Sequence, residues 1–244
     1  MFYICLSIYN EERDLPQLLV TLDDFIKNFG QPVQIVALND ASKDRTLPIL
    51  EEAARRLPIT VITTEYNRGF GYGIATLLEY VMKHGQADDV ALFMDADNTH
   101  DPGLAPKFME KIRAGADVVI ASRFQPDSVI TGFPLRRRML SRLAAFYFGM
   151  VLHLPGVRDY TSGFRTYRVG ILQKLGQTCN QHIVLPYSFE CQITILHLLS
   201  PFARFAEIPF IYRYDAKQGI SKLRLWRTVR NTLKIGAMML VERR

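Results

Sequence analysis

Apolar residues along the first half of the chain follow two alternating patterns. Short, β-rich runs at 2–8, 33–38, 59–63, 90–94 and 117–121 each predict a buried strand. Between these runs the apolar residues recur at helical spacing, which predicts helices at about 13–28, 44–57, the stretch ending at 84, and 104–113. A strand alternating with a helix at this spacing is typical of βαβ units. We therefore expect an α/β fold with a mostly parallel central sheet and helices on both faces.

The second half is less regular. Three arginines at 136–138 precede a predicted helix at about 139–154, a strand is expected at 205–214, and the segment 219–222 leads into a final helix. That final helix is two-faced: Leu225, Val229, Leu233, Gly236 and Leu240 share one side, and Arg227, Arg230, Asn231 and Lys234 share the other. The pattern suits a helix lying on an anionic membrane and equally a helix packed on its own domain. We favour the membrane because the arginine cluster and the helix after it have the same character.

Length and charge bound the classes of function. With 244 residues, 48% of them hydrophobic, and no evident linker, we predict a single domain spanning 1–244. Residues 1–122 carry 11 Lys and Arg against 18 Asp and Glu, whereas residues 123–244 carry 19 against 6. The first half is therefore suited to hold a cation and the second to meet an anion, such as nucleic acid, anionic lipid or a phosphorylated molecule. We set nucleic acid aside because no recognition motif is present.

Cysteine usage and the start of the chain bear on location. Cys5, Cys179 and Cys191 form no close pair and no zinc spacing, which favours reduced thiols in the cytosol. Met1 leads almost directly into an apolar strand, so we expect no signal peptide. No stretch reaches the roughly 18 apolar residues of a membrane-spanning helix. The chain is therefore expected at the cytoplasmic face of a membrane, bound peripherally.

Two carboxylates one residue apart follow the predicted strand 90–94. Asp95 and Asp97 would repel each other unless a cation lay between them, and carboxylate oxygens suit Mg²⁺ or Mn²⁺. A solvated acidic turn is the alternative for such a short motif. Polar groups also follow the other predicted strands, and ligands in parallel sheets bind at the carboxyl ends of the strands. We therefore expect one crevice lined by Glu11, Asp40, Gly69, Asp97 and Arg123.

These motifs together resemble those of the family 2 glycosyltransferases, which have the nucleotide-sugar-binding GT-A fold. Within that family the chain is most similar to polyprenyl-phosphate and dolichol-phosphate sugar transferases of the dolichol-phosphate mannosyltransferase type. The segments that carry the resemblance, in chain order, are 9–11, 39–46, 67–69, 95–97, 122–123, 161–165 and 221–222. The resemblance implies a metal-dependent, inverting transfer of a sugar from a GDP-mannose or UDP-glucose type of donor to a polyprenyl or dolichyl monophosphate.

The resemblance also implies roles for particular residues. Asp95, Asp97 and Arg123 would be catalytic, with both aspartates at the metal ion. Tyr9, Glu11 and Asp40 would hold the nucleoside, and Arg123, Arg165 and Lys222 could hold phosphates of the donor or the acceptor. Asn67, Gly69 and Ser221 would also bind substrate. Residues 1–122 would thus form the nucleotide-sugar half, and residues 123–244 the acceptor and membrane half.

The nature of the acceptor decides whether a general base is required. A sugar hydroxyl must lose a proton as it attacks, whereas a phosphate monoester is already largely ionised, its second pKa being about 6. The basic second half favours the phosphate. The alternative is an enzyme acting on a glycan or soluble hydroxyl, with Asp101, Asp159 or Glu190 as base. A non-catalytic nucleotide-binding module is less favoured, and a membrane-embedded partner or self-association is compatible with the pattern.

Overall fold

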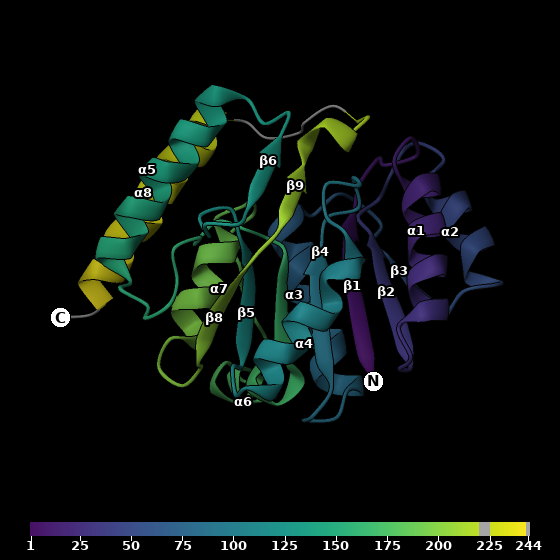
Figure 1. Ribbon diagram of the computed structural model, residues 1–244, viewed down its shortest axis with the longest axis horizontal. Helices are drawn as coiled ribbons and strands as arrows, with labels where there is room; N and C mark the ends of the chain where they lie inside the picture. Colours follow the sequence, from purple (N-terminus) through teal and green to yellow (C-terminus); the bar gives the residue numbers. More distant parts are fainter. Residues whose placement is uncertain (220–224, 243–244) are drawn as a thin grey trace.

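The structure is a computed structural model that describes residues 1–219 and 225–242 (Figure 1). In the first half every predicted element is present within a few residues of its expected bounds. The strands are Phe2–Ile8 (β1), Val33–Asn39 (β2), Ile59–Thr63 (β3), Val90–Met94 (β4) and Val118–Ser122 (β5). The helices are Leu15–Asn28 (α1), Thr46–Ala54 (α2), Phe70–His84 (α3), the short 3₁₀ turn Pro102–Leu104 (η1) and Ala105–Arg113 (α4).

The second half contains more elements than its sequence pattern predicts. They are Val129–Thr131 (β6), Leu135–Val151 (α5), Arg165–Arg168 (β7), Val169–Thr178 (α6), Cys191–Leu199 (α7), Phe205–Pro209 (β8), Ile211–Arg213 (β9), Tyr214–Ala216 (η2) and Leu225–Glu242 (α8). The single strand expected at 205–214 is divided at Phe210. That residue bonds to Val129 and Ser128 instead of continuing the central sheet, so β8 and β9 belong to different sheets.

The central sheet has the order β3-β2-β1-β4-β7-β5-β8. Every neighbouring pair is parallel except those formed by β7, which runs antiparallel between β4 and β5. A second, two-stranded parallel sheet pairs β6 with β9. The expectation of a mostly parallel sheet is thus confirmed, and the sheet takes strands from both halves of the chain.

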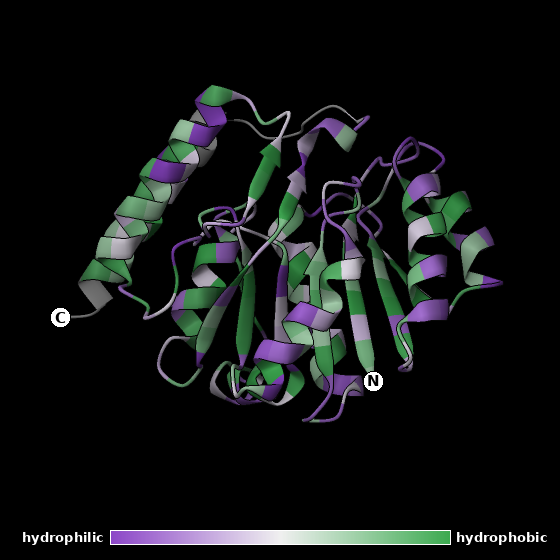
Figure 2. Ribbon diagram, in the orientation of Figure 1, coloured by the Kyte–Doolittle hydropathy of each residue, from purple (hydrophilic) through white to green (hydrophobic). Residues whose placement is uncertain are grey.

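Helices cover both faces of the central sheet, as expected. The alternation along β1 shows the two layers: Phe2, Ile4 and Leu6 pack under α1, α2 and α4, whereas Tyr3 and Cys5 pack under α3, α6 and α7. In Figure 2 the central strands are predominantly hydrophobic, while hydrophilic bands recur along α1. The parallel strands all point their carboxyl ends to one edge, where the polar segments meet.

Helices α5 and α8 lie side by side at one end of the molecule (Figure 1). Their contact is close because Gly236 faces the ring of Tyr147, where a side-chain Cβ would come within 2.4 Å of the ring. The two-faced prediction for α8 is therefore only partly correct. Gly236 is buried against α5 as the wheel suggests, but Leu233 and Leu240 on the same predicted side are 52% and 46% exposed.

Helix α5 differs from its prediction in position and in exposure. It begins at Leu135 directly after Pro134, so the arginines 136–138 form its first turn and do not precede it. Phe148 and Val151 anchor it to the core. A continuous row of exposed apolar side chains covers its outer face: Leu135, Met139, Leu143, Phe146 and Met150. Among the described residues, no helix combines the length and the apolarity needed to span a bilayer.

Candidate active site

The paired aspartates lie in a tight turn at the carboxyl end of β4. The backbone N–H of Asp95 donates to Nδ1 of His100 at 3.0 Å, and the hydroxyl of Thr99 donates to Oδ1 of Asp97 at 2.6 Å. Asn98 adopts a left-handed φ of 61° and donates its side-chain amide to the carbonyl of Asp14. Side chains on both sides of the turn thus fix its shape.

His100 connects this turn to the core of the protein. Its ring stacks on Phe164 with centroids 4.5 Å apart and an angle of 6° between the planes. Burial lowers the pKa of His100 to about 4, even though the nearby charge of Asp97 acts in the opposite direction. The imidazole is therefore neutral near pH 7, and its Nδ1 can accept the hydrogen bond from Asp95.

The two carboxylates have opposite electrostatic surroundings. Burial, reinforced by the charge of Asp97, raises the pKa of Asp95 to about 7. Burial also acts to raise the pKa of Asp97, but the charge and hydrogen bond of Lys217 outweigh it and lower the pKa overall. Nζ of Lys217 lies 2.5 Å from Oδ2 of Asp97, and both side chains are largely buried. A cation therefore already occupies one side of this carboxylate pair.

Mg²⁺ or Mn²⁺ fits these two carboxylates. Oxygen ligands are the right donor type, and the ammonium at Asp97 marks a position that favours positive charge. Among the described residues no cluster supplies three metal-ligating side chains of the His, Cys, Asp and Glu types. The remaining ligands would have to come from water and from phosphate oxygens of a substrate, as is usual for Mg²⁺.

Asp40, expected at the nucleoside, organises the neighbouring loop. Its carboxylate accepts hydrogen bonds from the backbone N–H groups of Arg68 and Gly69, both at 2.8 Å, and from the hydroxyl of Thr64. The side chain of Asn67 donates to the carbonyl of Asp40. The carboxylate is buried, and its hydrogen bonds in this structure hold the loop at 67–69.

The glycines after β3 make room for another protein segment. A Cβ on Gly71 would lie 1.7 Å from the carbonyl oxygen of Pro186, and one on Gly69 would lie 2.4 Å from the ring of Tyr187. The phenol of Tyr187 also donates to the side-chain carbonyl of Asn67 at 3.0 Å. The segment around 186–187 therefore packs on residues 67–71, a contact that the sequence pattern did not indicate.

Arg123 is held in place at the end of β5. Its Nε and Nη2 donate to the two carboxylate oxygens of Asp159 at 2.8 and 2.6 Å, and Nη2 also donates to the hydroxyl of Thr161 at 2.6 Å. Asp159 is fully buried, and it also accepts from the backbone of Ser162. The predicted general base Asp159 is thus the partner that orients Arg123.

Arg165 does not lie where the sequence analysis placed it. It is the first residue of β7 and is fully buried, with Nη1 and Nη2 donating to the carbonyls of Gln192 and Tyr160 at 2.6 and 2.8 Å. The expectation that it faces the crevice as a phosphate ligand is therefore wrong for this structure. An arginine that satisfies two buried carbonyls joins β7 to α7 and to the loop before β7.

The other predicted site residues have mixed outcomes. Tyr9 and Glu11 lie half-buried just after β1, as expected for the edge of the crevice. Ser221 and Lys222 lie outside the described residues, so their assignment stays a prediction.

Sequence reasoning missed His100, Asp14 and Lys217. The only signal was their nearness in sequence to Asp95, Glu11 and the segment 219–222, and that nearness did not specify a contact.

A small basic pocket lies between β5 and α5. Its cavity of about 30 Å³ is lined by Arg123, Phe124, Ile130, Phe133, Arg138, Ser141 and Arg142. The hydroxyl oxygen of Ser141 is buried and has no hydrogen-bond partner within the described part of the chain. A pocket lined by three arginines and a buried hydroxyl is suited to bind a phosphate group.

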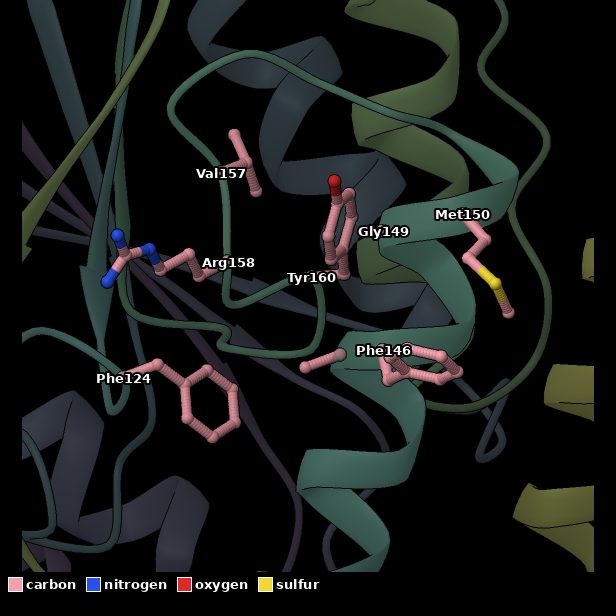
Figure 3. A pocket seen from close by; sticks show the side chains of 8 residues that line it. Phe124, Phe146, Gly149, Met150, Val157, Arg158 and Tyr160 are labelled. Atoms are coloured by element: carbon pink, nitrogen blue, oxygen red, sulfur yellow. The ribbon is translucent and has the colours of Figure 1, made fainter.

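An apolar groove adjoins this basic pocket and shares Phe124 with it. The groove has a volume of about 370 Å³ and runs along the next turns of α5, between that helix and the loop at 157–160 (Figure 3). Its lining residues are Phe124, Ala145, Phe146, Gly149, Met150, Val157, Arg158 and Tyr160. Phe146 and Met150 also belong to the exposed apolar face of α5, so the groove opens onto that face.

Solved structures identify the fold. The mostly parallel α/β sheet matches the GT-A fold of its structural neighbours. One is glucosyl-3-phosphoglycerate synthase from Mycobacterium tuberculosis, crystallised with Mn²⁺ and UDP. Its superposition includes 100% of this chain and 79% of that protein, with a TM-score of 0.62 and 14% identity. S. aureus TarS (residues 1–349) covers 98% of this chain and 64% of its own, at a TM-score of 0.59 and 18% identity.

Sequence comparison then gives the family. The model of glycosyl transferase family 2 matches residues 3–176, and the chain belongs to this family. The dolichol-phosphate mannosyltransferase of Pyrococcus furiosus is 28% identical over 224 residues, 91% of this chain and 58% of that protein. The polyprenol monophosphomannose synthase of Mycolicibacterium smegmatis is 27% identical over 220 residues, 90% of this chain and 80% of its own. The chain thus spans little more than half of the first of these relatives.

Proposed function

We propose that this chain transfers a sugar from a nucleotide-sugar donor to a polyprenyl or dolichyl monophosphate at the cytoplasmic surface of a membrane. The donor is of the GDP-mannose or UDP-glucose type. The names of the relatives support the lipid class of the acceptor. The observation that carries the proposal is the continuity, along α5, of the basic pocket, the apolar groove and the exposed apolar face. One ligand that is anionic at one end and apolar along its chain matches all three.

The acceptor phosphate would lie in the basic pocket, held by Arg123, Arg138 and Arg142. The first isoprene units would follow the groove past Phe124 and reach the bilayer at the outer face of α5. Because Asp159 fixes two nitrogens of Arg123, the guanidinium is already oriented and loses little freedom on binding phosphate. The cations position the nucleophile, and no general base is required.

In the reaction, a phosphate oxygen of the acceptor attacks the anomeric carbon, and the bond from that carbon to the donor diphosphate breaks with inversion. The nucleoside diphosphate leaves with the bonding electron pair. Asp95 and Asp97 would hold Mg²⁺ or Mn²⁺, which neutralises the charge that grows on the leaving diphosphate. Asp95 would also orient the sugar, while Tyr9 and Glu11 lie where the nucleoside is expected.

A hydroxyl acceptor remains the second candidate because of Glu190. This residue is 1% exposed, and neither carboxylate oxygen has a hydrogen-bond partner in the described part of the structure, so it is available as a base. Asp101 is less suitable because its carboxylate accepts from the backbone of Gly103 at the start of η1. Asp159 is committed to Arg123.

The test is donor turnover with and without lipid. The protein is incubated with Mg²⁺ or Mn²⁺, a panel of nucleotide sugars, and either polyprenyl phosphate or soluble glycan acceptors, and released nucleoside diphosphate is measured. Release that depends on polyprenyl phosphate and stops with EDTA supports the proposal. Release that depends only on a hydroxyl acceptor, and falls with Glu190→Gln, favours the alternative.

A matched pair of variants tests the metal ligand. Asp97→Asn keeps the side-chain volume but loses the charge, and turnover should fall by at least about a hundredfold. Asp101→Asn, the same change on an exposed residue four positions away, should keep most of the activity. Equal activity of the two variants would contradict the assignment of Asp97.

A further inference from the structure

The segment 214–219, named here the strap, crosses the carboxyl ends of β1 and β4. At one end the carboxylate of Asp215 accepts a short hydrogen bond from the hydroxyl of Thr131 on β6. At the other end the backbone N–H groups of Gln218 and Gly219 donate to the fully buried carboxylate of Asp14, at 2.9 and 2.8 Å. Lys217 lies between these two attachments, so the strap delivers its ammonium to a defined position.

That position is the carboxylate expected to bind the metal ion. Oδ1 of Asp97 is engaged by Thr99, and Oδ2 is engaged by the ammonium of Lys217 at 2.5 Å. The side chain of Lys217 is only 15% exposed, and Glu11 and Asp95 are the next carboxylates that attract it. The ammonium thus sits among three carboxylates in a largely buried place, where a single positive charge is strongly favoured.

An ammonium and a divalent ion cannot share this place. A Mg²⁺ ion bound at Oδ2 would lie only about 2.0–2.1 Å from the oxygen. The lysine nitrogen on the same oxygen would then be a close positive neighbour with little water between the charges. Like charges at such a distance repel strongly when buried. The lysine must therefore move away when the ion binds.

The released ammonium has an anion within reach. The ion keeps ligand positions for phosphate oxygens, so a bound donor would place its diphosphate beside Asp97. Lysine carries its charge on a flexible four-carbon stem with three donors, which suits a short transfer from carboxylate to phosphate. The strap can stay attached through Asp14 and Thr131 while the side chain changes partner.

We propose that Lys217 stands in for the divalent ion in the metal-free enzyme and moves to the donor diphosphate when the ion binds. The second half of this statement rests on the proposed function, whereas the first half concerns Asp97 and the ion alone. In this scheme Lys217 is a positioning residue for the donor. It weakens binding of metal by itself and strengthens binding of the metal and diphosphate together. The enzyme therefore takes up the ion mainly with its nucleotide.

Binding measurements on three variants test the exchange. Lys217→Met removes the charge and keeps a similar length, Lys217→Arg keeps the charge, and Lys107→Met makes the same change on an exposed lysine of α4. Mn²⁺ alone is titrated into each protein, and free Mn²⁺ is measured by electron paramagnetic resonance. GDP and UDP are then titrated at saturating Mn²⁺ by calorimetry. Thermal unfolding of each variant checks that it is folded.

The two affinities of Lys217→Met should change in opposite directions. Lys217→Met should bind Mn²⁺ alone about tenfold more tightly than the natural protein, because a hydrogen bond to a charged group no longer has to be broken. The same variant should bind the nucleoside diphosphate with Mn²⁺ about tenfold more weakly. Lys217→Arg and Lys107→Met should both stay close to the natural protein.

Each other result overturns part or all of the proposal. Equal Mn²⁺ affinity of Lys217→Met and the natural protein would rule out the stand-in role. Tighter Mn²⁺ binding with unchanged diphosphate affinity would rule out the transfer to the donor. If the natural protein with Mn²⁺ binds no nucleoside diphosphate at all, the proposed function fails, and the titration with Mn²⁺ alone still decides the first half.

Discussion

Arg123 and Asp159 form a two-pronged ion pair in which Nε and Nη2 of the arginine meet the two oxygens of a carboxylate that has no exposure to solvent. The pair joins the end of β5 to the loop before β7. It therefore fixes both the orientation of the Arg123 guanidinium and the path of the chain into the middle of the sheet.

Removing one partner of this pair should be costly. Asp159→Asn leaves a largely buried guanidinium uncompensated, and unfolding in urea should show a loss of about 3–5 kcal/mol. Asp23→Asn is the matched control, because Asp23 pairs with Lys27 on the surface of α1, where such pairs contribute about 0.5 kcal/mol or less. Similar losses of unfolding free energy for the two variants would mean that the buried ion pair stabilises the fold no more than the surface pair.

The same pair predicts a dependence of stability on pH. Burial alone would raise the pKa of Asp159, but the charge and hydrogen bonds of Arg123 outweigh burial and hold it below its ordinary value. A carboxyl with a lowered pKa stabilises the fold above its unfolded pKa of about 3.9 and loses this contribution as the pH falls toward its folded pKa. The difference in unfolding free energy between the natural protein and Asp159→Asn should thus be constant near neutral pH and shrink below about pH 4. A difference that stays constant down to pH 3 would contradict this.

Two glycines of ordinary helical conformation should respond in opposite ways to alanine. Gly71→Ala places a methyl group 1.7 Å from the backbone carbonyl of Pro186, which cannot move aside like a flexible side chain, so stability should fall by about 1–3 kcal/mol or more. Gly149→Ala on α5 meets no atom within 4 Å and should raise stability by up to about 1 kcal/mol. Thermal unfolding of the pair measures both. A neutral Gly71→Ala would show that the segment 186–187 is not docked on this loop in solution.

The apolar face of α5 should bind membrane. Leu143 is 62% exposed and lies outside the groove, so Leu143→Glu leaves the proposed acceptor site intact. Losing the burial of one leucine in lipid, about 1.5–3 kcal/mol, should lower partition into anionic vesicles at least about tenfold. Val20→Glu changes a similarly exposed side chain on α1 and should have little effect. Co-sedimentation of both variants at the level of the natural protein would place the membrane contact elsewhere.

The first half of the fold could be predicted from the sequence because local pattern and tertiary structure agree there. Strand β4 is fully apolar and bounded by polar turns, so its sequence predicts a buried strand. Helix α1 shows its buried leucines at helical spacing. The second half lacks this agreement. Strand β7 has only four residues and an arginine at each end. Arg165 is buried with its donors on the carbonyls of Tyr160 and Gln192, and the contact with Gln192, 27 positions away, could not be read from the local pattern.

The site shows the same division. The positions of Asp95, Asp97 and Arg123 could be predicted because each follows a strand that the pattern predicts. The contacts of Lys217 with Asp97 and of Tyr187 with Asn67 join residues 120 positions apart, and no local spacing predicts such a pairing. The exposed row on α5 was obscured because the arginines at 136–138 were placed before the helix and not in its first turn.

The antiparallel strand β7 has a geometric consequence for the chemistry. By entering between β4 and β5, it separates the aspartates from Arg123 by two strand spacings, roughly 10 Å. Under the proposed function, that spacing would leave room for a sugar ring between the leaving diphosphate and the incoming phosphate. The inserted strand β7 would therefore set the spacing between the carboxylates at the donor diphosphate and the guanidinium at the acceptor phosphate.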